Sequence, residues 1–241
     1  AVQLLQMWEA LDRPSKFMIV EMGAGSGLLA RDILEYAGRM RLTFAESLRY
    51  LALDRYTGTI EGQGPTRAER LVTANIPIGN VVGCFISNEL VDSTPIHRFQ
   101  VHDGAIKEIY VTVNESGGLV EILDAPSSRR LSEYLDNLTP RLSEGFKGEI
   151  NLNIRPWMDE LTRALAMGFV LTVDYGYDMG ELYSPKCSKG TLQTYYRHHQ
   201  GGGPYVRIGR QDITTHVDFS LIESEGDAAG LRSLGVVSQS A

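Results

Sequence analysis

The chain has 241 residues, and its 30 acidic and 23 basic side chains give a net charge of −7 at pH 7. This acidic balance argues against a protein that binds nucleic acid through a basic face. Apolar residues make up 43% of the sequence, enough for a large core, but no apolar run has the length of about 20 residues that a membrane-spanning helix needs. We therefore expect neither a nucleic-acid partner nor membrane insertion.

The two cysteines do not form the framework of a disulfide-rich domain, since Cys84 lies in an apolar run and Cys187 in a polar stretch. We expect a reducing compartment. No metal site is predicted, because neither Cys-x-x-Cys nor His-x-x-x-His occurs. The sequence opens within an amphipathic pattern and closes within an apolar one. We therefore expect residues to be missing at both ends, where a targeting segment could have been lost.

The first half of the chain alternates helical and strand-like patterns. Apolar spacing predicts helices at residues 2–11, 28–40, 44–50 and, after a loop, within 57–71. Apolar runs predict buried strands at residues 17–22, 50–54 and 81–87. This alternation indicates βαβ units around a parallel sheet.

The second half of the chain begins with a different rhythm. Runs with partial period-2 character between residues 97 and 123 are broken at HDG and NESGG, which predicts an antiparallel meander. Later patterns predict helices at 127–138, 156–168 and 216–231, and strands at 169–174 and 232–239. Residues 176–218 form a long polar stretch, typical of a functional cap or an insertion.

A run of spaced glycines, VEMGAGSGLLAR, follows the first predicted strand. Gly23, Gly25 and Gly27 would let the backbone turn tightly and approach a ligand, and the N-terminus of the next helix favours an anion. A dinucleotide loop, G-x-G-x-x-G, would need its third glycine at Leu28. Glu21 would oppose a phosphate but favour an ammonium or a sulfonium. The loop therefore fits S-adenosylmethionine better than NAD.

Polar side chains also end the next two predicted strands. Asp54 stands where a carboxylate can accept hydrogen bonds from both hydroxyls of an adenosine ribose. Asn88, Glu89 and Asp92 in SNELVDSTP follow the third strand, and ligands of open α/β sheets bind outside the carboxyl ends of strands. A solvated strand end and a polar helix cap are the structural alternatives. Combined with the glycine loop, both stretches favour a site for a methyl donor.

Six segments, in chain order, resemble the MidA-type S-adenosylmethionine-dependent methyltransferases, a family that includes the mitochondrial complex I assembly-factor methyltransferase. The segments are VEMGAGSGLLARDIL, SNELVDSTPIHRF, EINLNIRPWMDELTRAL, FVLTVDYGY, GTLQTYYRHH and RQDITTHVDF. The most specific are SNELVDSTP and DITTHVDF, and the resemblance covers nearly the whole chain. Ala24 departs from it, because the family often has Pro there, and LDRYTGTIEGQG is less family-like.

The resemblance implies an α/β fold of the Rossmann-like class I methyltransferase type. Its mostly parallel sheet would carry an inserted subdomain of antiparallel β-meander and helix. We therefore divide the chain into a cofactor-binding first half, residues 1–95, an insertion, residues 96–150, and a second half, residues 151–241. The second half includes a long cap loop, residues 176–218.

The resemblance also assigns three sets of residues by matching positions. S-adenosylmethionine, whose product is S-adenosylhomocysteine, would be bound by Glu21, Gly23, Gly25, Gly27, Asp54 and Asn88. Catalysis would rest on Glu89, Asp92, His216 and Asp218. The substrate pocket would be lined by Asp174 and Tyr175.

The reaction that the resemblance implies is methylation of a protein arginine, with a subunit of complex I as a candidate substrate. Glu89 and Asp92 could grip the charged guanidinium in bidentate fashion, and His216 could relay the released proton or simply pack. A non-catalytic assembly factor with the same fold and a NAD-dependent oxidoreductase are the alternatives. The protein could form a homodimer. It would be cytoplasmic if bacterial and would lie in the mitochondrial matrix if eukaryotic.

Overall fold

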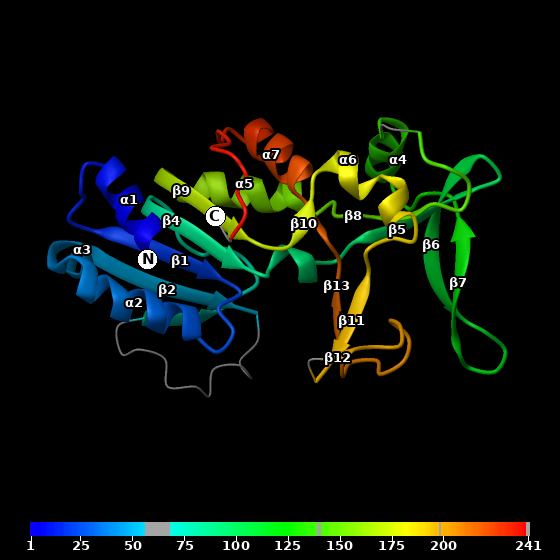
Figure 1. Cartoon of the computed structure of the whole chain (residues 1–241), viewed down its shortest axis with the longest axis horizontal. Coiled ribbons are helices and arrows are strands. Elements are labelled where there is room, and N and C mark those ends of the chain that lie inside the picture. Colours follow the sequence, from blue (N-terminus) through cyan, green and yellow to red (C-terminus); the bar gives the residue numbers. More distant parts are fainter. Residues whose placement is uncertain (56–67, 139–140, 198, 240–241) are drawn as a thin grey trace.

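A five-stranded, fully parallel sheet is the centre of the computed structural model, which describes residues 1–55, 68–138, 141–197 and 199–239 (Figure 1). The strand order is β3-β2-β1-β4-β9, so the chain winds outward from β1 in one direction and from β4 in the other. Such a reversal opens a crevice at the carboxyl ends of the two central strands. The strands are β1 (Phe17–Met22), β2 (Leu48–Asp54), β3 (Ala68–Val72), β4 (Val81–Asn88) and β9 (Leu165–Val173).

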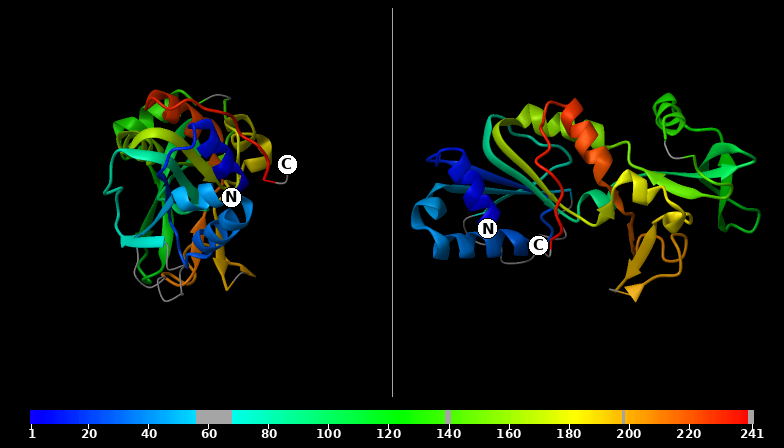
Figure 2. Two further views of the ribbon diagram at one scale, coloured as in Figure 1. Left: turned by 90° about the vertical axis from the view of Figure 1, so that its left-hand side faces the viewer. Right: turned by 45° about the horizontal axis from the view of Figure 1, so that its top comes forward.

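Helices cover both faces of this sheet (Figure 2). Alternate residues of β1 point to opposite faces, so Phe17 and Ile19 join one core cluster and Val20 and Met22 join another. The first cluster is closed by α1 (Val2–Ala10), α2 (Leu28–Met40) and α3 (Leu42–Ser47). The second is closed by α5 (Ile154–Ala164) and α7 (Phe219–Ala228).

The predicted meander forms a separate four-stranded antiparallel sheet with the order β7-β6-β5-β8. Its first three strands turn at HDG and NESGG, as the sequence predicted, and a later strand, β8, joins them. The elements are β5 (His97–His102), β6 (Ala105–Val113), β7 (Leu119–Asp124), the helix α4 (Arg129–Asp136) and β8 (Lys147–Ile150). A third core cluster, with Phe99 and Leu131 at its centre, packs α4 onto this sheet.

The stretch predicted as a polar cap contains short elements. A parallel pair joins β10 (Gly176–Tyr177) to β14 (Val217–Asp218), and a three-stranded antiparallel sheet has the order β12-β11-β13. The remaining elements are α6 (Met179–Leu182), the 3-10 turn η3 (Pro185–Cys187), β11 (Gln193–Tyr196), β12 (His199–Gln200) and β13 (Asp212–Thr214). We call residues 188–214 the finger, because β11 and β13 extend away from the central sheet (Figures 1 and 2).

Three element predictions were wrong where the structure describes the chain. The helix predicted within 57–71 lies partly outside the described residues, and its end forms β3, because pairing with β2 outweighs local helix propensity. The helix predicted at 156–168 is α5, which already ends at Ala164, and β9 begins at the next residue. No strand forms at residues 232–238, which pair with none of the described strands.

Candidate active site

The glycine loop lies between β1 and α2, at the crevice of the central sheet. Gly23, Gly25 and Gly27 have φ values of 73°, 50° and 78°, which side-chain-bearing L-residues rarely adopt. The N–H groups of Gly23 and Ala24 both donate to the carbonyl of Leu53, at 3.0 and 3.1 Å. Backbone hydrogen bonds therefore hold the loop, with its three left-handed glycines, against the end of β2.

The middle of the loop faces open space. A Cβ atom added to Gly25 would meet no other group within 4 Å. The N–H of Gly25 donates to the Asp54 carboxylate at 2.8 Å, so the acid at the end of β2 lies directly beside the loop. The sequence predicted that these two elements meet, and the structure brings them together.

Glu21 has a protein partner. Its side chain is 3% exposed and accepts a hydrogen bond from the Tyr50 hydroxyl at 2.8 Å. Burial raises the pKa of Glu21, and the Tyr50 hydrogen bond opposes that rise. A carboxylate placed in this way orders β1 against β2. A direct contact between Glu21 and the cofactor stays a prediction.

Arg70 is a neighbour of the loop that sequence reasoning missed. It projects from β3, and its Nη2 lies 3.5 Å from the carbonyl oxygen of Gly25 and 2.0 Å from where a Cβ of Gly27 would lie. Its Nη1 is buried and has no hydrogen-bond partner among the described residues. No motif signals this residue, because its position depends on the pairing of β3 with β2.

The acidic stretch after β4 packs against the glycine loop. A Cβ on Gly23 would lie 2.9 Å from Cδ1 of Leu90, so the two segments touch. Asn88 and Glu89 are exposed, and Glu89 has a φ of 48° while its N–H donates to Val173 at 2.9 Å. A non-glycine residue in this left-handed region is uncommon and is often found at functional sites.

Asp92, in the same stretch, is buried and held in place by hydrogen bonds. Its side chain is 5% exposed, one carboxylate oxygen accepts from the Tyr175 hydroxyl, and the other is buried without a partner among the described residues. Asp174 accepts from the N–H groups of Val91 and Asp92 at 3.0 and 3.3 Å. Burial and the neighbouring Asp92 raise the pKa of Asp174 to about 6, and burial also raises the pKa of Asp92.

His216 joins this cluster through Tyr175. The centres of the two rings are 5.6 Å apart in an edge-to-face arrangement, and the ring of Tyr177 is 5.0 Å away. The N–H of His216 donates to Oγ1 of Thr191 at 3.0 Å, and burial lowers the pKa of the imidazole. A neutral imidazole at pH 7 follows from that direction, so His216 can accept a proton.

Asp218 does not join the cluster through any described hydrogen bond. Its carboxylate caps α7 by accepting from the N–H of Leu221 at 3.1 Å, and Tyr134 lies at 3.5 Å. Burial raises the pKa of Asp218. The structure thus gives this residue a capping position, and its predicted catalytic role stays a prediction.

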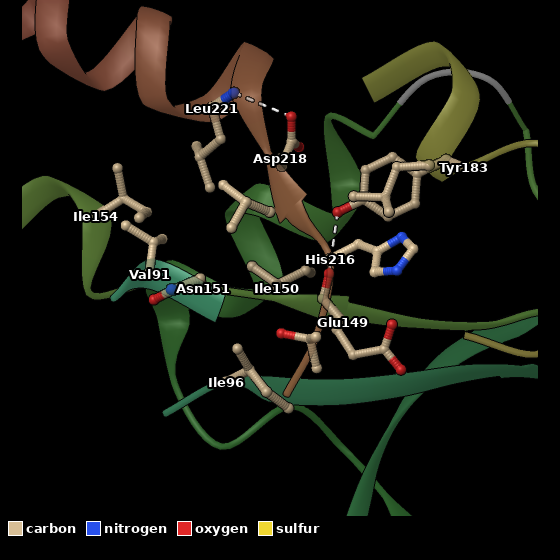
Figure 3. Close-up of a pocket in the computed structure, with 13 residues that line it drawn as sticks. Val91, Ile96, Glu149, Ile150, Asn151, Ile154, Tyr183, His216, Asp218 and Leu221 are labelled. Atoms are coloured by element: carbon tan, nitrogen blue, oxygen red, sulfur yellow. Dashed lines mark hydrogen bonds between the residues drawn. The ribbon is translucent and has the colours of Figure 1, made fainter. Parts of the chain in front are cut away.

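His216 and Asp218 both line a small pocket (Figure 3). Glu149, Asn151 and Val91 also line it, and its volume of about 20 Å³ suffices for a water molecule but not for a cofactor. An adjoining groove of about 340 Å³ lies between α4 and α7. Neither cavity is lined by the glycine loop, so the open crevice above Gly25 is the better candidate for the cofactor.

Other binding features lie outside this crevice. The described residues include one group of possible metal ligands, His102, Asp103 and Glu144, all exposed around the β5–β6 hairpin. None of the helices in the described ranges combines the length and the apolar character needed to span a bilayer.

Comparison with known proteins decides the family. A sequence profile described as "Putative S-adenosyl-L-methionine-dependent methyltransferase" matches residues 1–237. The chain belongs to this methyltransferase family. The cofactor of the family is S-adenosylmethionine, so the oxidoreductase alternative is wrong.

Solved structures show the same fold. A crystal structure from Burkholderia thailandensis, of a protein bound to S-adenosyl-homocysteine, has 26% sequence identity and a TM-score of 0.79. The match covers 93% of this chain and 58% of that protein. The α/β, Rossmann-like prediction is therefore confirmed.

Curated relatives of this family member carry a more specific name. "Protein arginine methyltransferase NDUFAF7 homolog, mitochondrial" from Drosophila melanogaster is 23% identical over 95% of this chain, and its mouse counterpart is 24% identical over 99%. The human protein is 22% identical over 99%. The chain spans 57–58% of the length of these relatives.

The residues of the crevice fit the family's cofactor. Open space over Gly25 allows a ligand to approach the backbone, and the N-terminus of α2 favours the cofactor's carboxylate. Asp54 offers carboxylate oxygens to the ribose hydroxyls. We expect Gly23, Gly25, Gly27 and Asp54 to hold S-adenosylmethionine. This member of the family thus has a crevice of suitable chemistry beside the acidic stretch after β4.

Proposed function

We propose that this protein transfers a methyl group from S-adenosylmethionine to an arginine side chain of a protein. The contact between Leu90 and Gly23 carries the proposal, because it sets the acidic loop, residues 88–92, against the cofactor loop. An arginine side chain is always charged in proteins, and a carboxylate is the group that holds its guanidinium most strongly. The names of the curated relatives point to the same acceptor.

Glu89 is the carboxylate that would receive the guanidinium. It is exposed, whereas Asp92 is buried and already accepts from Tyr175. Asp92 would then act as a positioning residue, holding the Tyr175 ring beside the incoming side chain. The left-handed backbone of Glu89 supports this division, because an uncommon conformation is kept where the surrounding structure requires it.

The cofactor supplies an electrophilic methyl group on its sulfonium. The protein's part is to align the acceptor nitrogen and to remove a proton from it once the new N–C bond has formed. His216 can take that proton, because burial keeps its imidazole neutral at pH 7. Asp174 fixes the acidic loop through its bonds to the backbone of Val91 and Asp92.

Transfer of labelled methyl groups to arginine-containing proteins tests this proposal. Glu89→Gln keeps the shape of the side chain but removes its charge, so we expect transfer to fall by about 100-fold or more. Affinity for S-adenosylhomocysteine should stay within about tenfold of the unmodified protein. Glu115→Gln, an exposed turn residue, is the matched control. Unchanged transfer by Glu89→Gln would remove this residue from the mechanism.

A non-catalytic scaffold with the same fold is the second candidate. It predicts cofactor binding by calorimetry without any labelled arginine, whatever protein is offered. The acceptor in a complex I subunit and the compartment both stay predictions, although the curated relatives are named mitochondrial.

A further inference from the structure

The finger has the opposite charge from the rest of the protein. Residues 188–214 contain four basic residues, at positions 189, 197, 207 and 210, and one acidic residue, Asp212. The finger therefore carries a net charge of +3, which leaves −10 on the remainder of a chain of −7. Acidic residues outnumber basic ones in the rest of the chain, so the basic finger is a local exception.

Three arginines of the finger have no carboxylate partner among the described residues. Arg197, Arg207 and Arg210 are exposed, and no described residue forms a salt bridge with them. The guanidinium carbons of Arg197 and Arg207 instead lie 5.3 and 4.7 Å from the centre of the Tyr196 ring. Elsewhere in the described ranges, eight arginines lie within 4.0 Å of a carboxylate: Arg13, Arg31, Arg39, Arg41, Arg98, Arg129, Arg130 and Arg155.

Two guanidinium groups on one ring concentrate positive charge. Like charges held close together repel, and here no carboxylate of the described chain offsets the repulsion. The same loop exposes Val206 and Ile208, which are 51% and 68% exposed. Arginine beside exposed apolar side chains is the composition of a protein-binding surface.

The finger is anchored at the candidate active site. Thr191, near its start, accepts the N–H of His216, and Thr215, just after its end, donates its N–H to the carbonyl of Asp92 at 3.0 Å. A protein bound along the finger would therefore extend toward the acidic loop. The hydrogen bonds of Tyr205 to Arg98 and Glu121 fix the finger against the antiparallel sheet.

We propose that the finger is the docking surface for an acidic and apolar segment of the protein that is methylated. This inference rests on the proposed function. Charge complementarity favours such a partner, because acidic residues would neutralise the three unpaired arginines. A nucleic acid is disfavoured, since its phosphates would meet the charge of −10 on the remainder of the chain.

The test measures the binding of a peptide probe, which is independent of the methyl-transfer assay described above. The probe is a short fluorescein-labelled peptide rich in Glu, Asp, Leu and Phe, followed by anisotropy. The variant carries Arg197→Gln, Arg207→Gln and Arg210→Gln, and the matched control carries Arg13→Gln, Arg39→Gln and Arg129→Gln, with the same change in net charge. We expect the finger variant to bind the probe about tenfold more weakly and the control to bind it normally. Binding should also weaken as ionic strength rises.

Several results would overturn the inference. Equal loss in both triple variants would mean that only net charge matters. Binding to phosphatidylserine vesicles but not to the peptide would make the finger a membrane contact. A dimer that becomes a monomer in the finger variant would make it a contact with a second copy. If the peptide binds as expected but no arginine is ever methylated, the proposed function fails while the docking surface stands.

Discussion

The substitution Gly25→Ala tests ligand binding by the glycine loop separately from the stability of the fold. Its φ of 50° makes alanine strained, at a cost of about 1–2 kcal/mol, but a Cβ there touches no protein atom. Thermal midpoints of domains of this size move by about 2–4 °C per kcal/mol, so the variant should melt roughly 2–8 °C lower. Gly117→Ala is the matched control, because Gly117 also has a left-handed φ and open space around its Cβ.

Only the Gly25 variant should lose stabilisation by ligand. At a concentration 100 times the Kd, S-adenosylhomocysteine stabilises a protein by about 2.7 kcal/mol, or roughly 5–11 °C here. A methyl group in the ligand's space costs about 2 kcal/mol, which weakens binding about 30-fold. The stabilisation by ligand then falls to about 0.9 kcal/mol, roughly 2–4 °C. Equal ligand shifts in both variants, measured by differential scanning fluorimetry, would refute the assignment of the loop.

Two further predictions concern Asp174 and the central sheet. The pKa of Asp174 is raised to about 6 in the fold, so its protonated form favours folding, and this contribution is lost as pH rises through 6. Urea unfolding should therefore show Asp174→Asn gaining stability relative to the unmodified protein between pH 4 and pH 7, and parallel curves would contradict this. Gly83→Ala should prevent folding, because its Cβ would lie 1.9 Å from the backbone oxygen of Met18 in the paired strand β1. Gly83→Ala should lower the free energy of unfolding by more than about 4 kcal/mol. Gly38→Ala, in α2 with open space around it, should instead raise it by about 1 kcal/mol. Unfolding followed by circular dichroism can measure both changes.

The strongest sequence patterns predicted the elements that hold the site. β1, α2 and β4 follow from apolar runs and helical spacing, and the meander follows from its turn sequences. The segment that forms β3 is short and half polar, so its conformation depends on pairing with β2 and could not be predicted locally. The finger also consists of strands of two to four residues, too short for a periodic pattern.

In the site too, some residues could be predicted from motifs, whereas the contacts of others depend on how the strands pair. The glycine loop, Asp54 and Asn88 could be predicted to gather, because parallel strands end at one edge of the sheet. The hydrogen-bond partners of the buried acids could not be predicted in this way. Tyr50 meets Glu21 only because β1 and β2 pair in a particular register, and Arg70 reaches the loop for the same reason.

The acidic residues of the motifs differ in their burial. Glu21 and Asp92 are buried, each accepts from a tyrosine hydroxyl, and burial raises the pKa of both. Both carboxylates are therefore already engaged by hydroxyl groups of the protein. Glu89 is exposed and Asp54 is partly so, which leaves room for a ligand to reach these two carboxylates. If methyl transfer depends on this division, neutralising Glu89 must affect the acceptor, whereas removing the hydroxyl of Tyr175 must first affect the position of the loop.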